Sequence, residues 1–296
     1  MRKSFFETIT QIASTDENLI FLTGDLGFGF IEQFIEKNPN QFLNVGVSEQ
    51  AMLGLANGLA SSGRKVICYS IAAFSLIRPF EFFRNGAIAQ NNSVMVVGVG
   101  PGFDYSQDGL SHYCLEDLAI MQSQPKVMIK TPFNPEGVRK SLEEFVSNPQ
   151  PTYLRLPRNS DNSEIVDFQK FEPKQIDILI FCTALMAKRA NKISQLLNQK
   201  GKSTLVGSLN ELSLATDEKL TNHLRKAKIC LVVEDHYEFG GIGSRIGDLI
   251  LSNNFETKLI KDGVMMIPKG EIGSFEYMEN KLMKPIQELI LKITKS

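Results

Sequence analysis

The feature that most constrains the fold is an alternation of short apolar runs with segments of helical periodicity over the first 160 residues. Strands of a parallel sheet that is covered by helices on both faces read as nearly continuous apolar runs. The pattern therefore predicts an α/β fold with a mainly parallel, doubly wound sheet. We expect strands at 19–24, 42–46, 65–70, 94–100, 126–131 and 151–157, and helices at 2–13, 30–37, 49–62, 78–90, 114–121 and 135–145.

A polar segment interrupts this pattern. Residues 158–175 are mostly polar or charged, with a proline near the end, which is typical of a linker and not of a core element. The alternation then resumes, with strands expected at 177–184, 203–209 and 228–235 and helices between them. A chain of 296 residues is long enough for two domains. We predict a first domain at 1–160, a linker at 161–175 and a second, smaller doubly wound domain at 176–296.

Charge and residue content exclude several functional classes. With 32 basic and 33 acidic residues, the chain has no field that would attract nucleic acid or an anionic membrane, so we expect neither as a partner. The N-terminus lacks a secretory apolar run, and no stretch approaches the roughly 18 apolar residues of a membrane span. The four cysteines form no CxxC pair, which favours reduced thiols in a cytoplasmic protein. The three histidines lack metal-ligand spacing, so we expect no metal ligand in this chain.

Two glycine-containing segments follow predicted strands. The segment "FGGIGSRIGDLI" could cradle a phosphate on backbone N–H groups, but its spacing matches neither a Walker motif nor GxGxxG, and a turn that approaches a neighbouring chain or sheet is the favoured alternative. The loop "VGPGFDYSQDGLSHYCLEDLA" leaves a predicted central strand, where α/β sheets bind ligands. In it, Asp108 could accept hydrogen bonds from hydroxyl groups, and His112 could donate or accept. A solvated turn is the alternative.

Glu49 is the third candidate, in "NVGVSEQAMLGLANGLA". As a helix-start acid, with Ser48 as the N-cap, it would only gain about 0.3 to 1 kcal/mol from the helix dipole. Its sequence neighbours, however, offer almost nothing polar to solvate a carboxylate. A carboxylate in apolar surroundings has a raised proton affinity and can hold or share a proton.

Together these segments resemble the transketolase family of thiamine diphosphate enzymes. The stretch "VGVSEQ" is similar to the family's "GIAEQ", "QDGLSHYCLEDLA" to "EDGPTHQPVEDLA", and "VEDHYEFGGIGS" to "EE....GGLGS". The three matches follow the family's order along nearly the whole chain and correspond to its pyrimidine-binding domain and its C-terminal domain. The diphosphate-binding domain with its GDG…N motif has no counterpart in this sequence.

The resemblance implies the β-type half of a split transketolase, a transferase that moves a two-carbon ketol unit between sugars. It implies thiamine diphosphate as cofactor, with Mg²⁺ or Ca²⁺ held by a separate diphosphate-binding chain. The expected assembly is an α2β2 heterotetramer in which copies of this chain also associate with each other. The substrates would be sugars or sugar phosphates.

The resemblance also assigns roles to residues of this sequence. Glu49 corresponds to the catalytic glutamate that hydrogen-bonds the pyrimidine ring of the cofactor. Phe74 and Ile71 correspond to the clamp around that ring, with a register uncertain by one residue and core packing as the alternative for Phe74. Asp25 corresponds to an aspartate at the cofactor and subunit interface, or else is a turn acid.

The remaining roles concern the sugars. Asp108 and His112 correspond to residues that hold the hydroxyl groups of the donor, and His112 also takes part in catalysis. Arg2 and Arg158 correspond to arginines for a sugar-phosphate acceptor, for which bidentate guanidinium contacts are suited. A small shift in the alignment with the family would place Arg155 at this position instead of Arg158.

Two departures from the family pattern concern the acceptor. Gly100 stands where the family has a histidine, and Gly29 stands where it has a serine that helps to hold phosphate. We expect these glycines to leave room for an acceptor other than the pentose phosphates, such as a larger or modified sugar.

Three other functions remain open at this stage. The β subunit of a 2-oxo acid dehydrogenase E1 shares the fold and the glutamate, but it usually carries a different histidine loop. Deoxyxylulose-phosphate synthase is normally one long chain. A non-catalytic scaffold relative would have no need of Glu49.

Overall fold

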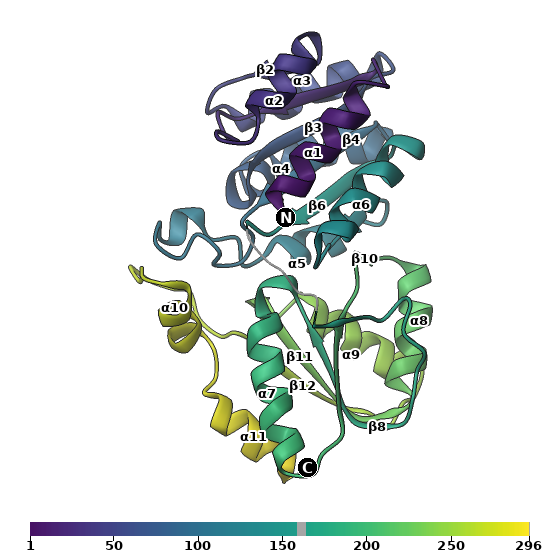
Figure 1. Cartoon of the computed structure of the whole chain (residues 1–296), viewed down its shortest axis with the longest axis vertical. Helices are drawn as coiled ribbons and strands as arrows, with labels where there is room; N and C mark the ends of the chain where they lie inside the picture. Colours follow the sequence, from purple (N-terminus) through teal and green to yellow (C-terminus); the bar gives the residue numbers. More distant parts are fainter. Residues whose placement is uncertain (159–163, 296) are drawn as a thin grey trace.

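Two mainly parallel β-sheets organise the computed structural model, which describes residues 1–158 and 164–295. Figure 1 shows the first sheet with its helices in the upper half and the second sheet in the lower half. The predicted fold class, two doubly wound α/β domains, is therefore confirmed.

The first sheet has the strand order β10-β5-β6-β4-β3-β1-β2. Its parallel strands are β1 (Leu19–Thr23), β2 (Phe42–Asn44), β3 (Lys65–Ile71), β4 (Val94–Val99), β5 (Met128–Lys130) and β6 (Thr152–Leu156). Its helices are α1 (Arg2–Ala13), α2 (Glu32–Lys37), α3 (Glu49–Ser61), α5 (Asp117–Gln122) and α6 (Pro135–Ser147). Short helical turns are η1 (Pro39–Gln41), η2 (Ala73–Ile77), α4 (Phe80–Phe82), η3 (Phe83–Ile88) and η4 (Leu110–His112).

Alternate residues of each strand enter cores on opposite faces of this sheet. Phe21 packs with α1 and α6 residues such as Phe5 and Leu142. Its neighbour Leu22 packs on the other face with α3 residues such as Met52. Burial on both faces explains why these strands read as apolar runs. Because β1 to β6 pair in parallel, their carboxyl ends lie at one edge of the sheet.

The second sheet has the order β12-β11-β8-β9-β7, with all its pairs parallel. Its strands are β7 (Val166–Asp167), β8 (Ile176–Cys182), β9 (Thr204–Ser208), β11 (Ala227–Tyr237) and β12 (Lys258–Val264). Around it lie η5 (Ala184–Met186), α7 (Ala187–Gln199), α8 (Leu214–Leu224), α9 (Ile242–Ser252), α10 (Phe275–Leu282) and α11 (Ile286–Thr294). Strand β12 and helices α10 and α11 follow the part of the sequence for which elements were expected.

Two expectations about secondary structure are only partly right. The segment expected as a helix at 78–90 is helical from Phe80 onward, but it is not one regular α-helix, because α4 ends at Phe82 and the chain continues as the π-helical η3. The segment expected to be only a linker supplies edge strand β7 and two buried residues, Ile165 and Phe168. Within the predicted linker, residues 161–163 lie outside the described residues.

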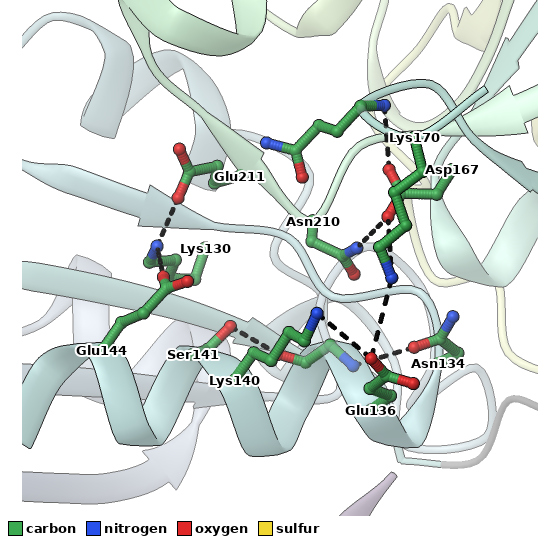
Figure 2. A pocket seen from close by; sticks show the side chains of 12 residues that line it. Lys130, Asn134, Glu136, Lys140, Ser141, Glu144, Asp167, Lys170, Asn210 and Glu211 are labelled. Carbon is green, nitrogen blue, oxygen red and sulfur yellow. Dashed lines mark hydrogen bonds and ion pairs between the residues drawn. The ribbon is translucent and has the colours of Figure 1, made fainter. Parts of the chain in front are cut away.

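A polar joint connects the two halves of the chain. Strand β10 (Glu211–Leu212) lies beyond β9 in sequence yet pairs antiparallel with β5 of the first sheet. Next to it is a cavity of about 180 Å³ between α6, β7 and β10. Figure 2 shows that its charged side chains bond one another, with Lys130 held by Glu144 and Glu211. None of the predicted site residues lines this cavity, which we interpret as structural.

Within the described residues, no helix is both long and apolar enough to span a membrane.

Candidate active site

The predicted site residues follow the carboxyl ends of the first sheet's strands. Asp25 follows β1, Glu49 follows β2, Ile71 ends β3, Phe74 lies in the next turn, Asp108 and His112 lie in the loop after β4, and Arg158 follows β6. This is the edge at which open α/β sheets bind ligands.

Glu49 begins α3 and is 2% exposed. Its Oε1 accepts a hydrogen bond from the Ser70 hydroxyl at 3.2 Å, and its Oε2 lies 3.0 Å from Nη1 of Arg78. The expectation that the carboxylate has almost no polar neighbours is therefore wrong, because both partners come from segments distant in the sequence. Ser48 occupies the N-cap position, but its side chain makes no capping hydrogen bond.

The predicted aromatic clamp is only partly accessible. Phe74 is half-buried, and the guanidinium of Arg78 lies over its ring, 3.9 Å from the centroid. The rings of Phe74 and His112 meet edge to face at 5.0 Å. Ile71 is buried at the end of β3, where it pairs with Val99 of β4. Phe74 thus connects the glutamate and the histidine of the candidate site.

The loop after β4 is closed at its base by two backbone hydrogen bonds between Gly102 and Cys114. His112 lies in its short helical turn η4, with Nδ1 3.0 Å from the Ser111 hydroxyl. Asp108 is exposed to solvent in the same loop. The loop therefore presents both residues predicted to hold the donor sugar.

Arg158 is joined to this loop through Tyr105. Its guanidinium lies 4.3 Å from the centroid of the Tyr105 ring, which in turn lies 6.0 Å from the His112 ring. The backbone N–H of Arg158 donates to Asp104 at 2.8 Å. Burial raises the pKa of the Asp104 carboxyl to about 6, although this hydrogen bond and the charge of Arg158 oppose the shift. The contacts form a continuous path from Glu49 to Arg158.

Arg2 stands at the start of α1, with its guanidinium 5.0 Å from the ring centroid of Phe30. Its charge acts on Asp104 and Tyr105, so it lies near the end of the path that holds Arg158. Among the described residues, the buried Nε atoms of both arginines have no hydrogen-bond partner. Each of these N–H groups could donate a hydrogen bond to an anionic ligand.

Asp25 is an exposed turn residue with a φ of 58°. Its side chain accepts a hydrogen bond from Asn44 at 2.9 Å, and its backbone N–H donates to the Asn44 side chain at 3.1 Å. These bonds fix the turn after β1 beside the end of β2.

The two glycines that were expected to leave room differ from each other. A Cβ on Gly100 would lie 2.2 Å from Cε2 of Tyr105, so the ring of Tyr105 already fills that space. The expectation is wrong there. At Gly29 no atom lies within 4 Å of the position of a Cβ.

Arg155 cannot replace Arg158 at this edge. It is 3% exposed and bonds Asp117 at 2.8 Å and Asp235 at 3.0 Å, at the junction of the two domains. Between the two arginines left open by the sequence, Arg158 is the one at the candidate site.

The glycine-rich segment has a structural explanation. The buried carboxylate of Glu234 accepts hydrogen bonds from the backbone N–H groups of Ile242 and Gly243, at 2.7 and 3.1 Å. A carboxylate of the chain itself thus occupies the N-terminus of α9, where a phosphate would bind.

We expect Glu234 to make stability depend on pH. Burial raises the pKa of its carboxyl from 4.5 to about 7, against the two backbone hydrogen bonds. A folded-state pKa above the unfolded one means that its stabilising contribution is complete below pH 4.5 and is lost as the pH rises to 7. Glu234→Gln should therefore flatten the fall in unfolding free energy over this range, by at most about 1.36 kcal/mol per pH unit. Urea unfolding of both proteins measures this, and parallel pH profiles would contradict it.

Sequence reasoning missed Ser70, Arg78 and Tyr105. Arg78 lies four residues after Phe74, a spacing that places a cation and a ring on one helical face, so the sequence did contain a signal for it. Ser70 reaches Glu49 from another strand, which no local pattern reveals.

Two family profiles match this chain. One, described as the transketolase pyrimidine binding domain, matches residues 1–162, and the other, described as the transketolase C-terminal domain, matches residues 170–279. The chain belongs to the transketolase family. A transketolase C-terminal section of Methanocaldococcus jannaschii is 30% identical to this transketolase chain over 278 residues, which are 89% of this chain and 86% of the relative.

Two further proteins are similar over most of their length. A subunit of the apulose-4-phosphate transketolase of Phocaeicola vulgatus is 27% identical over 268 residues, or 88% of this chain and 86% of the relative. A solved structure described as a split gene transketolase, inactive beta4 tetramer, has a TM-score of 0.83 at 23% identity and covers 99% of this chain and 97% of the relative. The solved structure shows the same fold, and the two sequence relatives favour the transketolase interpretation over a 2-oxo acid dehydrogenase subunit.

Proposed function

We propose that this chain is the pyrimidine-binding subunit of a two-chain transketolase, which uses thiamine diphosphate to move a two-carbon ketol unit between sugars. The observation that carries the proposal is the buried carboxylate of Glu49, held at the carboxyl edge of the sheet. A partner chain supplies the diphosphate site and the Mg²⁺ or Ca²⁺ ligands.

The residues at this edge fit a thiamine pyrimidine. The carboxylate of Glu49 can accept a hydrogen bond, and the ring of Phe74, which is joined to it through Arg78, is a flat apolar surface. Gly24 packs closely against this carboxylate, because a Cβ there would lie 3.3 Å from both Oε1 of Glu49 and Oγ of Ser70. Ile71 directly follows Ser70 at the end of β3, and Asp25 directly follows Gly24 in the turn after β1.

The side chains of the candidate site would each have a different role in ketol transfer. Thiamine diphosphate, when bound, supplies the nucleophilic carbon and the electron sink of ketol transfer. Glu49 shares and returns a proton at its carboxylate. His112 holds a donor hydroxyl at Nε2, because Ser111 occupies Nδ1. Asp108 accepts a second hydroxyl, and Arg158 and Arg2 bind an anionic group at the far end of a sugar.

The assembly is proposed from the relatives' descriptions. One relative is named as a transketolase subunit, and another is described as an inactive beta4 tetramer of a split gene transketolase. We therefore infer an α2β2 heterotetramer in the cytoplasm, built from copies of this chain that associate with each other and with a diphosphate-binding partner. The domain limits proposed for it are 1–160 and 176–296, with 161–175 between them.

An acceptor other than a pentose phosphate remains part of the proposal. Matched relatives are named for apulose-4-phosphate and for 6-deoxy-6-sulfo-D-fructose. Both sugars are ketoses, the class that donates the two-carbon unit, so these names bear on the donor and not on the acceptor. The open space at Gly29 supports a different acceptor, whereas Gly100 does not contribute to it.

The experiment that tests the function is reconstitution with the diphosphate-binding partner. We expect tight thiamine diphosphate binding by the pair but not by this chain alone, because each chain carries only part of the site. We also expect the pair to transfer a two-carbon unit from a ketose to an aldose. Analysis of the sugar products measures this transfer. Decarboxylation of a 2-oxo acid would favour the E1 alternative, and a pair that binds no cofactor would favour a scaffold.

A further inference from the structure

Arg78 makes both of the contacts that the proposed site would offer to a flat heterocycle. Its guanidinium donates to Oε2 of Glu49 at 3.0 Å, and the same planar group lies 3.9 Å from the centroid of the Phe74 ring. A guanidinium is planar and stacks on aromatic faces while it donates hydrogen bonds in its own plane. In these two respects it imitates an aminopyrimidine.

The arrangement leaves no place for a second flat group on that face of Phe74. At 3.9 Å the guanidinium is in van der Waals contact with the ring, so a heterocycle cannot enter between them. The ring of His112 also packs against that of Phe74, with the two centroids 5.0 Å apart and the rings inclined by 62°.

Arg78 can leave this position without disturbing the core. Its side chain is 47% exposed, whereas that of Glu49 is 2% exposed. It lies at the junction between the π-helical turn η2 and Pro79, outside any regular helix. Movement of Arg78 therefore costs its two local contacts and little else.

We propose that Arg78 is a positioning residue that occupies the pyrimidine position while no cofactor is bound. It keeps the buried carboxylate of Glu49 paired and the face of Phe74 covered, and it must move aside when the cofactor enters. This inference rests on the proposed function, since it takes Glu49 and Phe74 as the pyrimidine contacts. It makes cofactor binding an exchange of one planar hydrogen-bond donor for another.

The test is the affinity of the reconstituted pair for thiamine diphosphate, measured by calorimetry without sugar substrates. Arg78→Ala removes the competing group, so we expect binding about tenfold tighter than in the unaltered pair, which corresponds to about 1.4 kcal/mol of lost competition. Arg78→Lys keeps the charge but cannot stack as a plane, and should give an intermediate affinity.

Arg139→Ala is the matched control, because it removes an arginine whose exposed side chain pairs with Glu143 on the surface of α6. It should leave the affinity unchanged. Thermal unfolding of each variant shows whether it folds. If the alanine variant does not fold, the affinity of the Arg78→Lys variant tests the inference. Equal or weaker binding in the Arg78 variants, with normal binding by the unaltered pair, would overturn the inference but not the proposed function. Absence of binding in the unaltered pair would overturn both.

Discussion

A Glu49→Gln variant, assembled with its diphosphate-binding partner, is expected to turn over at least about 100-fold more slowly than the unaltered pair. Glutamine keeps the size of the side chain and can still accept a hydrogen bond from Ser70, but it cannot take up a proton from the cofactor. The loss should therefore appear in kcat. Steady-state ketol transfer at saturating cofactor and substrates measures it.

The fold should survive this change, because glutamine removes a buried charge without leaving a cavity. Thermal unfolding within a few degrees of the unaltered protein would show this. Glu143→Gln is a suitable control, since Glu143 is exposed and pairs with Arg139 on the surface of α6. A Glu49→Gln pair that retained more than about a tenth of the normal rate would remove Glu49 from the proposed mechanism.

The part of the fold that the sequence predicted is the part governed by local pattern. The strands β1, β3, β4 and β6 are buried on both faces, so each reads as an apolar run bounded by turns. The sequence pattern did not predict the two short strands β7 and β10. Strand β7 has only Val166 and Asp167 and lies in a polar stretch, and β10 pairs with a sheet that its neighbours in sequence do not join.

The candidate site was predicted in its positions but not in its contacts. Glu49 stands at the start of α3 as expected, because helix starts and strand ends are local features. What surrounds its carboxylate is not local, since Ser70 and Arg78 arrive from other segments. Gly100 illustrates the same limit, because only the fold reveals that Tyr105 fills the space beside it.

The buried ionic junction between the domains was missed for a related reason. Arg155 in β6 lies between Asp117 of α5 and Asp235 of β11, which are 38 and 80 residues away in sequence. Asp117 also accepts from the Tyr153 hydroxyl at 2.8 Å, and Asp235 from Thr183 at 2.6 Å. In the sequence, Arg155 looks like one more cation near a strand end.

We expect Arg155→Leu to lower the unfolding free energy by about 3 to 5 kcal/mol, the second large effect. The variant would leave the carboxylates of Asp117 and Asp235 buried and without their shared cation, and both are 0% exposed. Since a domain's whole stability is about 5 to 15 kcal/mol, the variant should unfold at much lower urea concentration. Urea unfolding followed by circular dichroism measures the change.

A triple variant can distinguish the effect of losing the cation of Arg155 from the effect of losing its packing. In a triple variant with Arg155→Leu, Asp117→Asn and Asp235→Asn, no buried charge is left unpaired, so a large part of the lost stability should return. Arg139→Ala, on the exposed face of α6, should change stability by less than about 0.5 kcal/mol. If Arg155→Leu cost less than about 1 kcal/mol, or if the triple variant were no more stable than the single one, the junction would not depend on charge pairing. The attachment of the two domains would then rest on their shared apolar core, which contains residues of both halves, such as Leu118 and Ile242.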